Sequence, residues 1–311
     1  MAQQTLHAVF TMDCEQLAVH SQDGGPADWN LSERAIVGFA EELRAQGFRA
    51  TYFLVPQAAE RHARLLLDLQ GEGFELGLHL HSPDQGWRDH LGGLTPEEQY
   101  GALAEASDRW AQVLGQAPRA FRSGNFSAND HTFPLLARLG YTHTSTSSPR
   151  RRLLARHAVW SEALPYAHWT HAGNRLLAGD LPVVEVPLCV HPTAARDAAQ
   201  TIPWEARIEG GEWEHHGEII AANLDWQEEL AAPLRTCVVF THNTREYSNP
   251  QDEMTRRLRR IMALLEEEAA RRNWQLAKTT VGGVRSALEG SRPVQGRQKG
   301  VTHVHWHPQG D

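Results

Sequence analysis

ELGLHLHSPD, residues 75–84, is an apolar, strand-like run that ends in two histidines. Residues i and i+2 of an extended segment face the same side, so the imidazoles of His79 and His81 are predicted to point the same way. Two imidazoles at the end of a buried strand are half of a typical ligand set for a divalent metal. The stretch therefore predicts a metal site whose other ligands come from elsewhere in the chain.

The alternation of short apolar runs with longer helical patterns predicts an α/β fold, built of βα units around a parallel sheet or barrel. The predicted strands are 7–13, 50–55, 74–80, 119–122, 141–145, 183–188 and 236–241. The predicted helices are 32–46, 57–70, 95–114, 130–139 and 251–273. Asn30-Leu31-Ser32 is expected to open the first helix, and Thr95, followed by Pro96, is the expected N-cap of the third.

We expect one domain over residues 1–288 and a C-terminal tail over residues 289–311. Two segments inside the domain, 146–182 and 189–235, are irregular and rich in Trp, His, Pro and Gly. We interpret them as insertions on the rim of the barrel, where loops usually carry substrate contacts. The tail contains His303, His305 and His307, which we do not assign to a site.

The composition favours a small or neutral ligand. The 311 residues are 41% hydrophobic and 22% charged, which is enough for one large α/β domain or two small ones. The formal net charge of −8 argues against a nucleic-acid or anionic-membrane partner, because such partners need clustered positive charge. The oligomeric state is left open, a homo-oligomer included.

The cysteines and the N-terminal segment predict a cytoplasmic protein. Cys14, Cys189 and Cys237 form no CxxC pair, which indicates a reducing compartment. The N-terminal residues lack a basic segment followed by an apolar stretch of about 7–15 residues, and no run approaches the roughly 20 apolar residues of a membrane span.

Polar side chains follow other predicted strands, where parallel α/β folds build their sites. Asp13 and Glu15 stand at i and i+2, so one carboxylate could bind a metal while the other acts as a general base, although either could instead cap the next turn. Arg122 could orient a catalytic carboxylate, bind substrate or form a plain salt bridge. His242 follows an apolar run and could act as a general acid.

Taken in order, these clusters resemble the polysaccharide deacetylase family, carbohydrate esterases that include chitooligosaccharide, chitin and peptidoglycan deacetylases. The resemblance spans roughly residues 5–285 and implies a distorted (β/α) barrel with about seven parallel strands. Residues 11–15, TMDCE, are similar to the first motif of the family, which implies that Asp13 is the catalytic base. Cys14 replaces the usual second Asp and is interpreted as a packing residue, so the resemblance passes the role of metal ligand to Glu15.

The later motifs complete the implied site. His79 matches the first histidine of the second motif, whereas Pro83 stands where the second is usual, so the resemblance gives His81 as the other ligand. Arg122 matches the arginine that holds the base carboxylate. His242 matches the histidine of the Leu-x-His motif, which protonates the leaving group.

The implied activity is metal-dependent hydrolysis, with Zn²⁺ as the expected ion, that removes an acetyl group from an N-acetylated amino sugar or a glycan precursor. Asn125, Trp87 and Tyr166 are the expected substrate-binding residues. Two alternatives stay open: a hydrolase of a small non-sugar amide or ureide on the same fold, and a noncatalytic glycan-binding barrel. The departures at Cys14 and Pro83 keep the second alternative open.

Overall fold

β1 (Thr5–Cys14) is the strand around which the rest of the molecule is arranged in the computed structural model, which describes residues 4–197, 199 and 201–290. On one side β1 pairs in parallel with β12 (Arg235–His242) along nearly its whole length. On its other side the first half pairs with β13 (Gln275–Thr279) and the second half with β2 (Ala50–Leu54), both in parallel. The polar carboxyl end of β1 is therefore enclosed by neighbouring strands.

The sheet continues from β2 through four further strands that pair in parallel, so that their carboxyl ends meet at the same edge. These are β3 (Glu75–Leu80), β4 (Ala120–Ser123), β5 (His143–Thr144) and β9 (Val184–Glu185). An antiparallel strand, β8 (His168–Trp169), ends the sheet. All seven predicted strands are present, and the predicted distorted (β/α) barrel is confirmed.

The curled sheet closes through irregular segments between β9 and β12. The amide of Cys189 donates to the carbonyl of Val238 at 3.1 Å, and the amide of Ile208 donates to that of Phe240 at 3.0 Å. Two short antiparallel pairs lie near this seam. They are β6 (Arg152–Leu153) with β7 (Ala158–Val159), and β10 (Val190–Ala195) with β11 (Pro203–Glu205).

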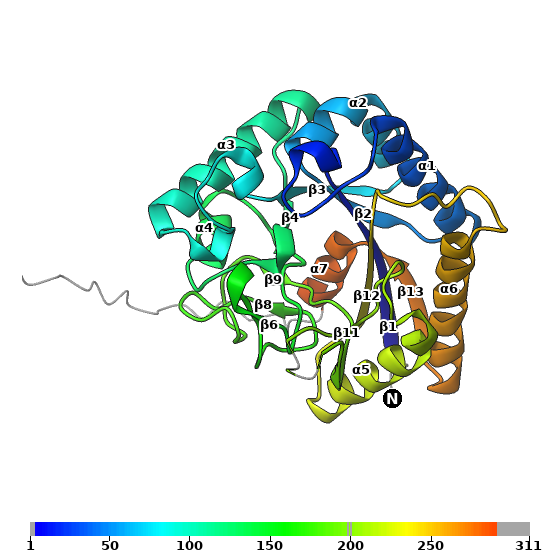
Figure 1. The fold of residues 1–311 in the computed structure, drawn as a ribbon. Helices are drawn as coiled ribbons and strands as arrows, with labels where there is room; N and C mark the ends of the chain where they lie inside the picture. The colour runs from blue at the N-terminus through cyan, green and yellow to red at the C-terminus, as the bar shows by residue number, and fades with distance from the viewer. Residues whose placement is uncertain (1–3, 198, 200, 291–311) are drawn as a thin grey trace, which may run out of the picture.

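Helices surround the sheet (Figure 1). They are α1 (Trp29–Ala45), α2 (Pro56–Gly71), α3 (Pro96–Leu114), α4 (Thr132–Arg138), α5 (His216–Glu229) and α6 (Glu253–Arg271). Thr95 caps α3 as predicted, in a capping box with Glu98. The predicted start of the first helix was wrong: α1 begins a few residues earlier, because the carboxylate of Asp28 accepts a hydrogen bond from the amide of Leu31.

Helix α5 lies inside the segment 189–235, which we expected to be irregular. Its buried face includes the polar residues Asn223 and Gln227, so the helical spacing of Ile219, Ile220 and Leu224 is hidden in the sequence. The two polar side chains hydrogen-bond to each other and to the backbone of Val190 and Thr236, which satisfies them inside the core. A buried helix stabilised in this way has no clear apolar stripe.

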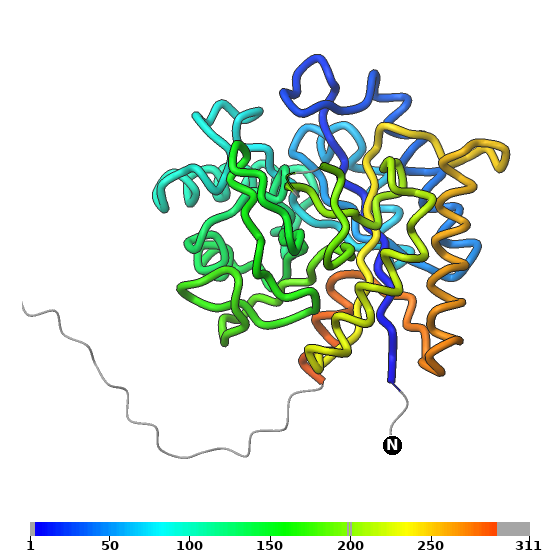
Figure 2. The backbone as a smooth tube through the Cα atoms, turned by 60° about the horizontal axis from the view of Figure 1, so that its bottom comes forward, coloured from blue at the N-terminus to red at the C-terminus, as the bar shows by residue number. Residues whose placement is uncertain are grey.

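Helix α7 (Val281–Gly290) closes the amino-terminal end of the barrel and lies inside the curve of the strands (Figure 1). Its Val281, Val284 and Leu288 belong to one buried cluster with β-strand residues such as Val9. Figure 2 shows β1 running from the N-terminus, at the lower edge, to the dark blue loop at the upper edge. The site residues gather at that second end.

The described helices are all too short or too polar to cross a bilayer, as judged over the described part of residues 4–290. Cys14 is fully buried in the core cluster that the outer helices share, as predicted for a residue on the face opposite Asp13 and Glu15. The predicted tail lies outside the described residues, except for positions 289 and 290, which belong to α7.

Candidate active site

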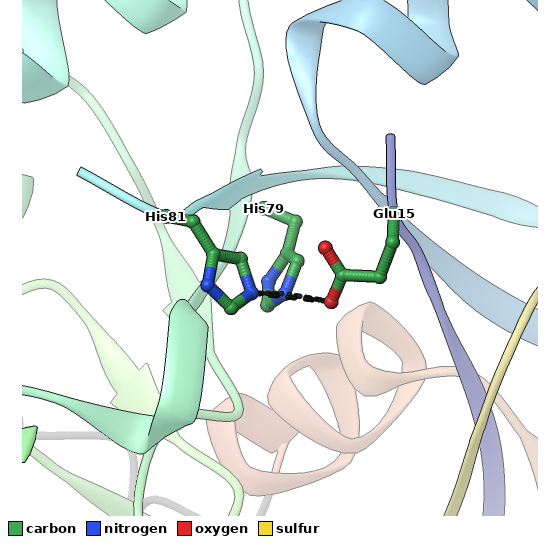
Figure 3. Close-up of side chains that lie close together, drawn as sticks. All are labelled: Glu15, His79 and His81. Atoms are coloured by element: carbon green, nitrogen blue, oxygen red, sulfur yellow. Dashed lines mark hydrogen bonds and ion pairs between the residues drawn. The ribbon is translucent and has the colours of Figure 1, made fainter. Parts of the chain in front are cut away.

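The side chains of Glu15, His79 and His81 converge at the carboxyl ends of β1 and β3 (Figure 3). Glu15 Oε1 lies 3.1 Å from Nε2 of each histidine, and the two Nε2 atoms lie 3.2 Å apart. All three side chains are buried. The i, i+2 spacing in the two strands thus delivers three donor atoms to one point.

These atoms have the spacing that a bound divalent metal requires. Donors around a tetrahedral zinc with bonds of about 2.0 Å stand about 3.3 Å apart, close to the separations observed here. Nδ1 of His79 lies 2.9 Å from the carbonyl oxygen of Arg122, which can only accept, so Nδ1 carries the hydrogen and Nε2 presents a lone pair. The second carboxylate oxygen of Glu15 is buried and has no hydrogen-bond partner among the described residues.

The electrostatics of the three residues favour positive charge at this point. Burial alone would raise the pKa of Glu15, but His81 and His79 outweigh it and hold that pKa well below its ordinary value. Burial likewise lowers the pKa of His81, yet the carboxylates of Glu15 and Asp23 raise it well above 6.5. Without a metal ion, the carboxylates of Glu15 and Asp23 therefore favour the protonated form of His81.

Asp13 lies beside these donors and is held by Arg122. Nη1 of Arg122 donates to Asp13 Oδ1 at 2.7 Å and to Thr11 Oγ1 at 2.8 Å. Its other nitrogens donate to the carbonyl and the hydroxyl of Ser145, both at 2.7 Å. The guanidinium is fully buried and stacks on the ring of Phe53, with 4.4 Å from Cζ to the ring centroid. An ionised Asp13 therefore has a fixed orientation.

His242 ends β12 and hydrogen-bonds through Nδ1 to the carboxylate of Glu209. Glu209 also accepts from Thr241 and Arg207. Burial opposes ionisation of Glu209, but the charges of His242 and Arg207 outweigh it and lower its pKa to about 2. Because a carboxylate only accepts, Nδ1 of His242 carries a hydrogen, and Nε2 is the ring nitrogen that Glu209 does not engage.

One cavity of about 290 Å³ joins these groups. The predicted site residues that line it are Asp13, Glu15, His79, His81, Asn125 and His242. Arg122 stands behind Asp13. Trp87 and Tyr166 are not brought to the cavity: the indole of Trp87 lies against Gly101 of α3, and the ring of Tyr166 lies against His168.

Four charged residues that line or support the cavity were not among the predicted site residues: Asp23, Arg151, Arg207 and Glu209. All four lie in irregular segments, where no strand end marks them. Asp23 alone had a local signal, since an acid before Gly24-Gly25 can place a carboxylate in a tight loop. Arg151 and Arg207 add two guanidinium groups to the wall of the cavity, each paired with a glutamate.

Residues 23–144 match the family model described as polysaccharide deacetylase, and the resemblance predicted from the sequence is confirmed over these residues. A search of curated proteins found no match.

Three solved structures share the fold over most of their length. A Mycobacterium smegmatis protein described as a polysaccharide deacetylase is 16% identical, with a TM-score of 0.59 and 96% of each chain covered. A Pseudomonas aeruginosa PAO1 protein of the same description is 14% identical, with a TM-score of 0.60 and 93% of each chain covered. Puue allantoinase is also 14% identical, with a TM-score of 0.60, covering 93% of this chain and 92% of its own. At such identities the likeness establishes the fold.

Proposed function

We propose that this chain, a member of the polysaccharide deacetylase family through residues 23–144, is a metal-dependent hydrolase that removes an acetyl group from an N-acetylated amino sugar or a glycan precursor. The observation that carries the proposal is the convergence of Glu15, His79 and His81 at 3.1–3.2 Å, inside the cavity that Asp13 also lines. A carboxylate and two imidazoles suit Zn²⁺.

Each residue has a separate task in the proposed hydrolysis. Glu15, His79 and His81 would hold a divalent ion, which would supply Lewis acidity to acidify water and polarise the amide carbonyl. Asp13 accepts the proton of the attacking water, and the hydrogen bond from Arg122 keeps that carboxylate oriented. The carbon–oxygen bond to water forms and the carbon–nitrogen bond breaks.

His242 donates the proton that the departing nitrogen needs. Its Nε2 faces the cavity side because Nδ1 is engaged by Glu209. The products are acetate and a protonated amine, and the proton that Asp13 took from water passes on to restore His242, so atoms and charge balance with one water consumed. Glu209 keeps the imidazole of His242 in the same orientation while the proton is transferred.

A second candidate is hydrolysis of a small non-sugar amide or ureide. The cavity of about 290 Å³ lies at the small end of ligand pockets, which run from about 300 to 1,000 Å³. The guanidinium groups of Arg151 and Arg207 in its wall suit the carbonyl oxygens of such a compound. The fold is shared with a protein named allantoinase, so the fold alone favours neither substrate class.

The test combines metal analysis with product analysis. Purified protein, loaded with Zn²⁺, is incubated with N-acetylglucosamine, its short oligomers and a panel of small amides and ureides, and acetate and ammonia are both measured. The variants are Asp13→Asn and His79→Ala. Asp130→Asn and His157→Ala are matched controls, since both residues lie in partly exposed ion pairs that do not line the cavity.

We expect stoichiometric zinc and acetate release in the wild type and both controls. Asp13→Asn should retain zinc and lose turnover, whereas His79→Ala should lose both. Ammonia without acetate would favour the second candidate. Full turnover in Asp13→Asn would refute the assignment of Asp13 as the base, and zinc retained in His79→Ala would refute the ligand set.

A further inference from the structure

The carboxylate of Asp23 binds Nδ1 of His81, the ring nitrogen that points away from Glu15 and His79. Nδ1 of His81 lies 3.1 Å from Oδ2 of Asp23, a carboxylate that can only accept, so Nδ1 carries the hydrogen. Nε2 then presents its lone pair toward Glu15 and His79. The other histidine, His79, is fixed instead by the backbone carbonyl of Arg122. Of the two imidazoles, only His81 therefore depends on a partner that a substitution can remove.

Asp23 is itself held from two sides. The amide of Asn125 donates to its Oδ2 at 2.7 Å, and Nη1 of Arg156 lies 2.7 Å from its Oδ1. Asn125 follows β4 and Arg156 belongs to the segment 146–182, so three parts of the chain meet at this carboxylate. Its side chain is only 11% exposed.

Two glycines allow the loop after β1 to bring Asp23 to this position. Gly24 has φ +102°, a conformation that residues with a Cβ rarely adopt. A Cβ on Gly25 would lie only 1.9 Å from the carbonyl oxygen of Gln16. The amide of Ala18 donates to the carbonyl of Pro26 at 3.0 Å and closes the loop. The backbone thus folds tightly against the end of β1, beside the metal ligands.

We propose that Asp23 is a positioning residue that locks His81 in the metal-binding tautomer and orientation. The inference rests on the proposed metal-dependent function. A carboxylate behind a ligating histidine fixes the ring and raises the basicity of its free nitrogen, and its loss typically costs about 10–100-fold in metal affinity. Asp23 does not belong to the cluster of convergent donors itself, because it faces the opposite nitrogen of the ring.

The test measures Zn²⁺ affinity, with no substrate present, by competition against a chromophoric chelator at pH 7.5. The variant is Asp23→Asn, which keeps the shape but cannot accept from His81, Asn125 and Arg156 together. The control is Asp89→Asn, because Asp89 forms a like pair with Nε2 of His157 at 3.1 Å, in a pair that does not line the cavity. Thermal unfolding of the apoproteins monitors folding, and ¹⁵N spectra of the imidazoles in the zinc-loaded proteins report the tautomer of His81.

We expect Asp23→Asn to weaken Zn²⁺ binding by about 10–100-fold. The affinity of the control should stay within about twofold of the wild type. The signal of the Nδ1-protonated tautomer of His81 should be reduced in Asp23→Asn alone. Unchanged affinity in Asp23→Asn, an equal loss in the control, or a wild type that binds no Zn²⁺ would overturn the inference. If Asp23→Asn does not fold, a wild-type spectrum in which His81 carries its hydrogen on Nε2 would overturn it, and one with the hydrogen on Nδ1 would support it. A wild type that binds Zn²⁺ and loses affinity as expected, but releases no acetate, would refute the proposed function and leave the role of Asp23 standing.

Discussion

Arg122 lies 2.7 Å from the carboxylate of Asp13 in a pair that is almost entirely buried. The guanidinium also donates hydrogen bonds to Thr11 and Ser145, and it lies over the ring of Phe53. A lysine ammonium cannot reproduce this arrangement, because it is a compact charge without a planar fork. Through Arg122, the proposed base on β1 is therefore connected to β4, to Phe53 of β2 and to Ser145, which follows β5.

We predict that Arg122→Lys lowers the free energy of unfolding by about 1–3 kcal/mol, because the ammonium keeps the charge beside Asp13 but leaves buried acceptors unpaired. Acetate release should fall by at least about 100-fold, since Asp13 loses its fixed orientation. Chemical denaturation and initial rates measure the two effects. Arg119→Lys, an exposed residue just before β4, is the control and should match the wild type in both. A fully active Arg122→Lys would contradict the role of the pair.

Gly124 is required at its position because the ring of His81 lies against it. A Cβ there would stand 2.6–2.7 Å from three atoms of that ring, well inside ordinary contact distance. We predict that Gly124→Ala displaces His81 and weakens Zn²⁺ binding by about tenfold or more, as a shifted ligand does. Gly71→Ala is the matched control, because nothing lies within 4 Å of a Cβ at Gly71. Equal zinc affinities in the two variants would show that the ring of His81 moves without cost.

The part of the site that lies on strands could be predicted from the sequence, because strand geometry converts spacing into direction. Asp13 with Glu15, and His79 with His81, stand at i and i+2 after apolar runs, and the structure places each pair on one face. Parallel pairing then brings the ends of β1 and β3 together across β2. Both steps follow from local rules.

Asp23 and Glu209 could not be predicted in this way. Asp23 contacts His81 and Glu209 contacts His242, each from a segment without regular secondary structure. The direction of such a side chain depends on the tertiary fold and cannot be read from residue spacing. The position of Trp87 has a related cause: a large aromatic in a loop packs wherever apolar surface is available, here against α3. Loop residues therefore need the structure, whereas strand-end residues do not.

Glu75 lies at the amino-terminal end of the barrel, opposite the proposed metal site. A substitution there shows whether the stability of the fold can change without changing metal binding. Glu75 begins β3 and accepts hydrogen bonds from the hydroxyl of Thr51 at 2.7 Å and from the amide of Gly282 in α7 at 3.0 Å. We predict that Glu75→Ala lowers the free energy of unfolding by about 2–4 kcal/mol, because it leaves buried donors unsatisfied. Zn²⁺ affinity should stay within about twofold, since six residue steps along the extended chain separate Glu75 from His81 by roughly 20 Å.

Glu72→Ala is the control for this prediction, because Glu72 forms an exposed ion pair with Arg44. Exposed pairs contribute about 0–1 kcal/mol, so Glu72→Ala should unfold almost as the wild type does. Denaturant titrations of the apoproteins measure the difference. A large fall in Zn²⁺ affinity in Glu75→Ala would mean that α7 supports the metal ligands and that the two ends of the barrel are coupled.

Glu209 should make stability depend on pH in a defined window. Its pKa is about 2 in the folded protein against an ordinary value of 4.5, so the unfolded chain binds the proton more readily. The stabilisation is therefore complete above about pH 5 and is lost as the pH falls from 4.5 toward 2. A shift of this size corresponds to about 3 kcal/mol at neutral pH, and about 1 kcal/mol of it should be lost by pH 4.

We predict that Glu209→Gln is less stable than the wild type at pH 7 and that the gap narrows by about 1 kcal/mol on going to pH 4, because the glutamine does not titrate. Urea unfolding of the apoproteins at several pH values measures the gap. Glu162→Gln, whose parent side chain is 80% exposed, should follow the wild type at every pH. A gap that stays constant between pH 7 and pH 4 would show that Glu209 is not held ionised by His242 and Arg207.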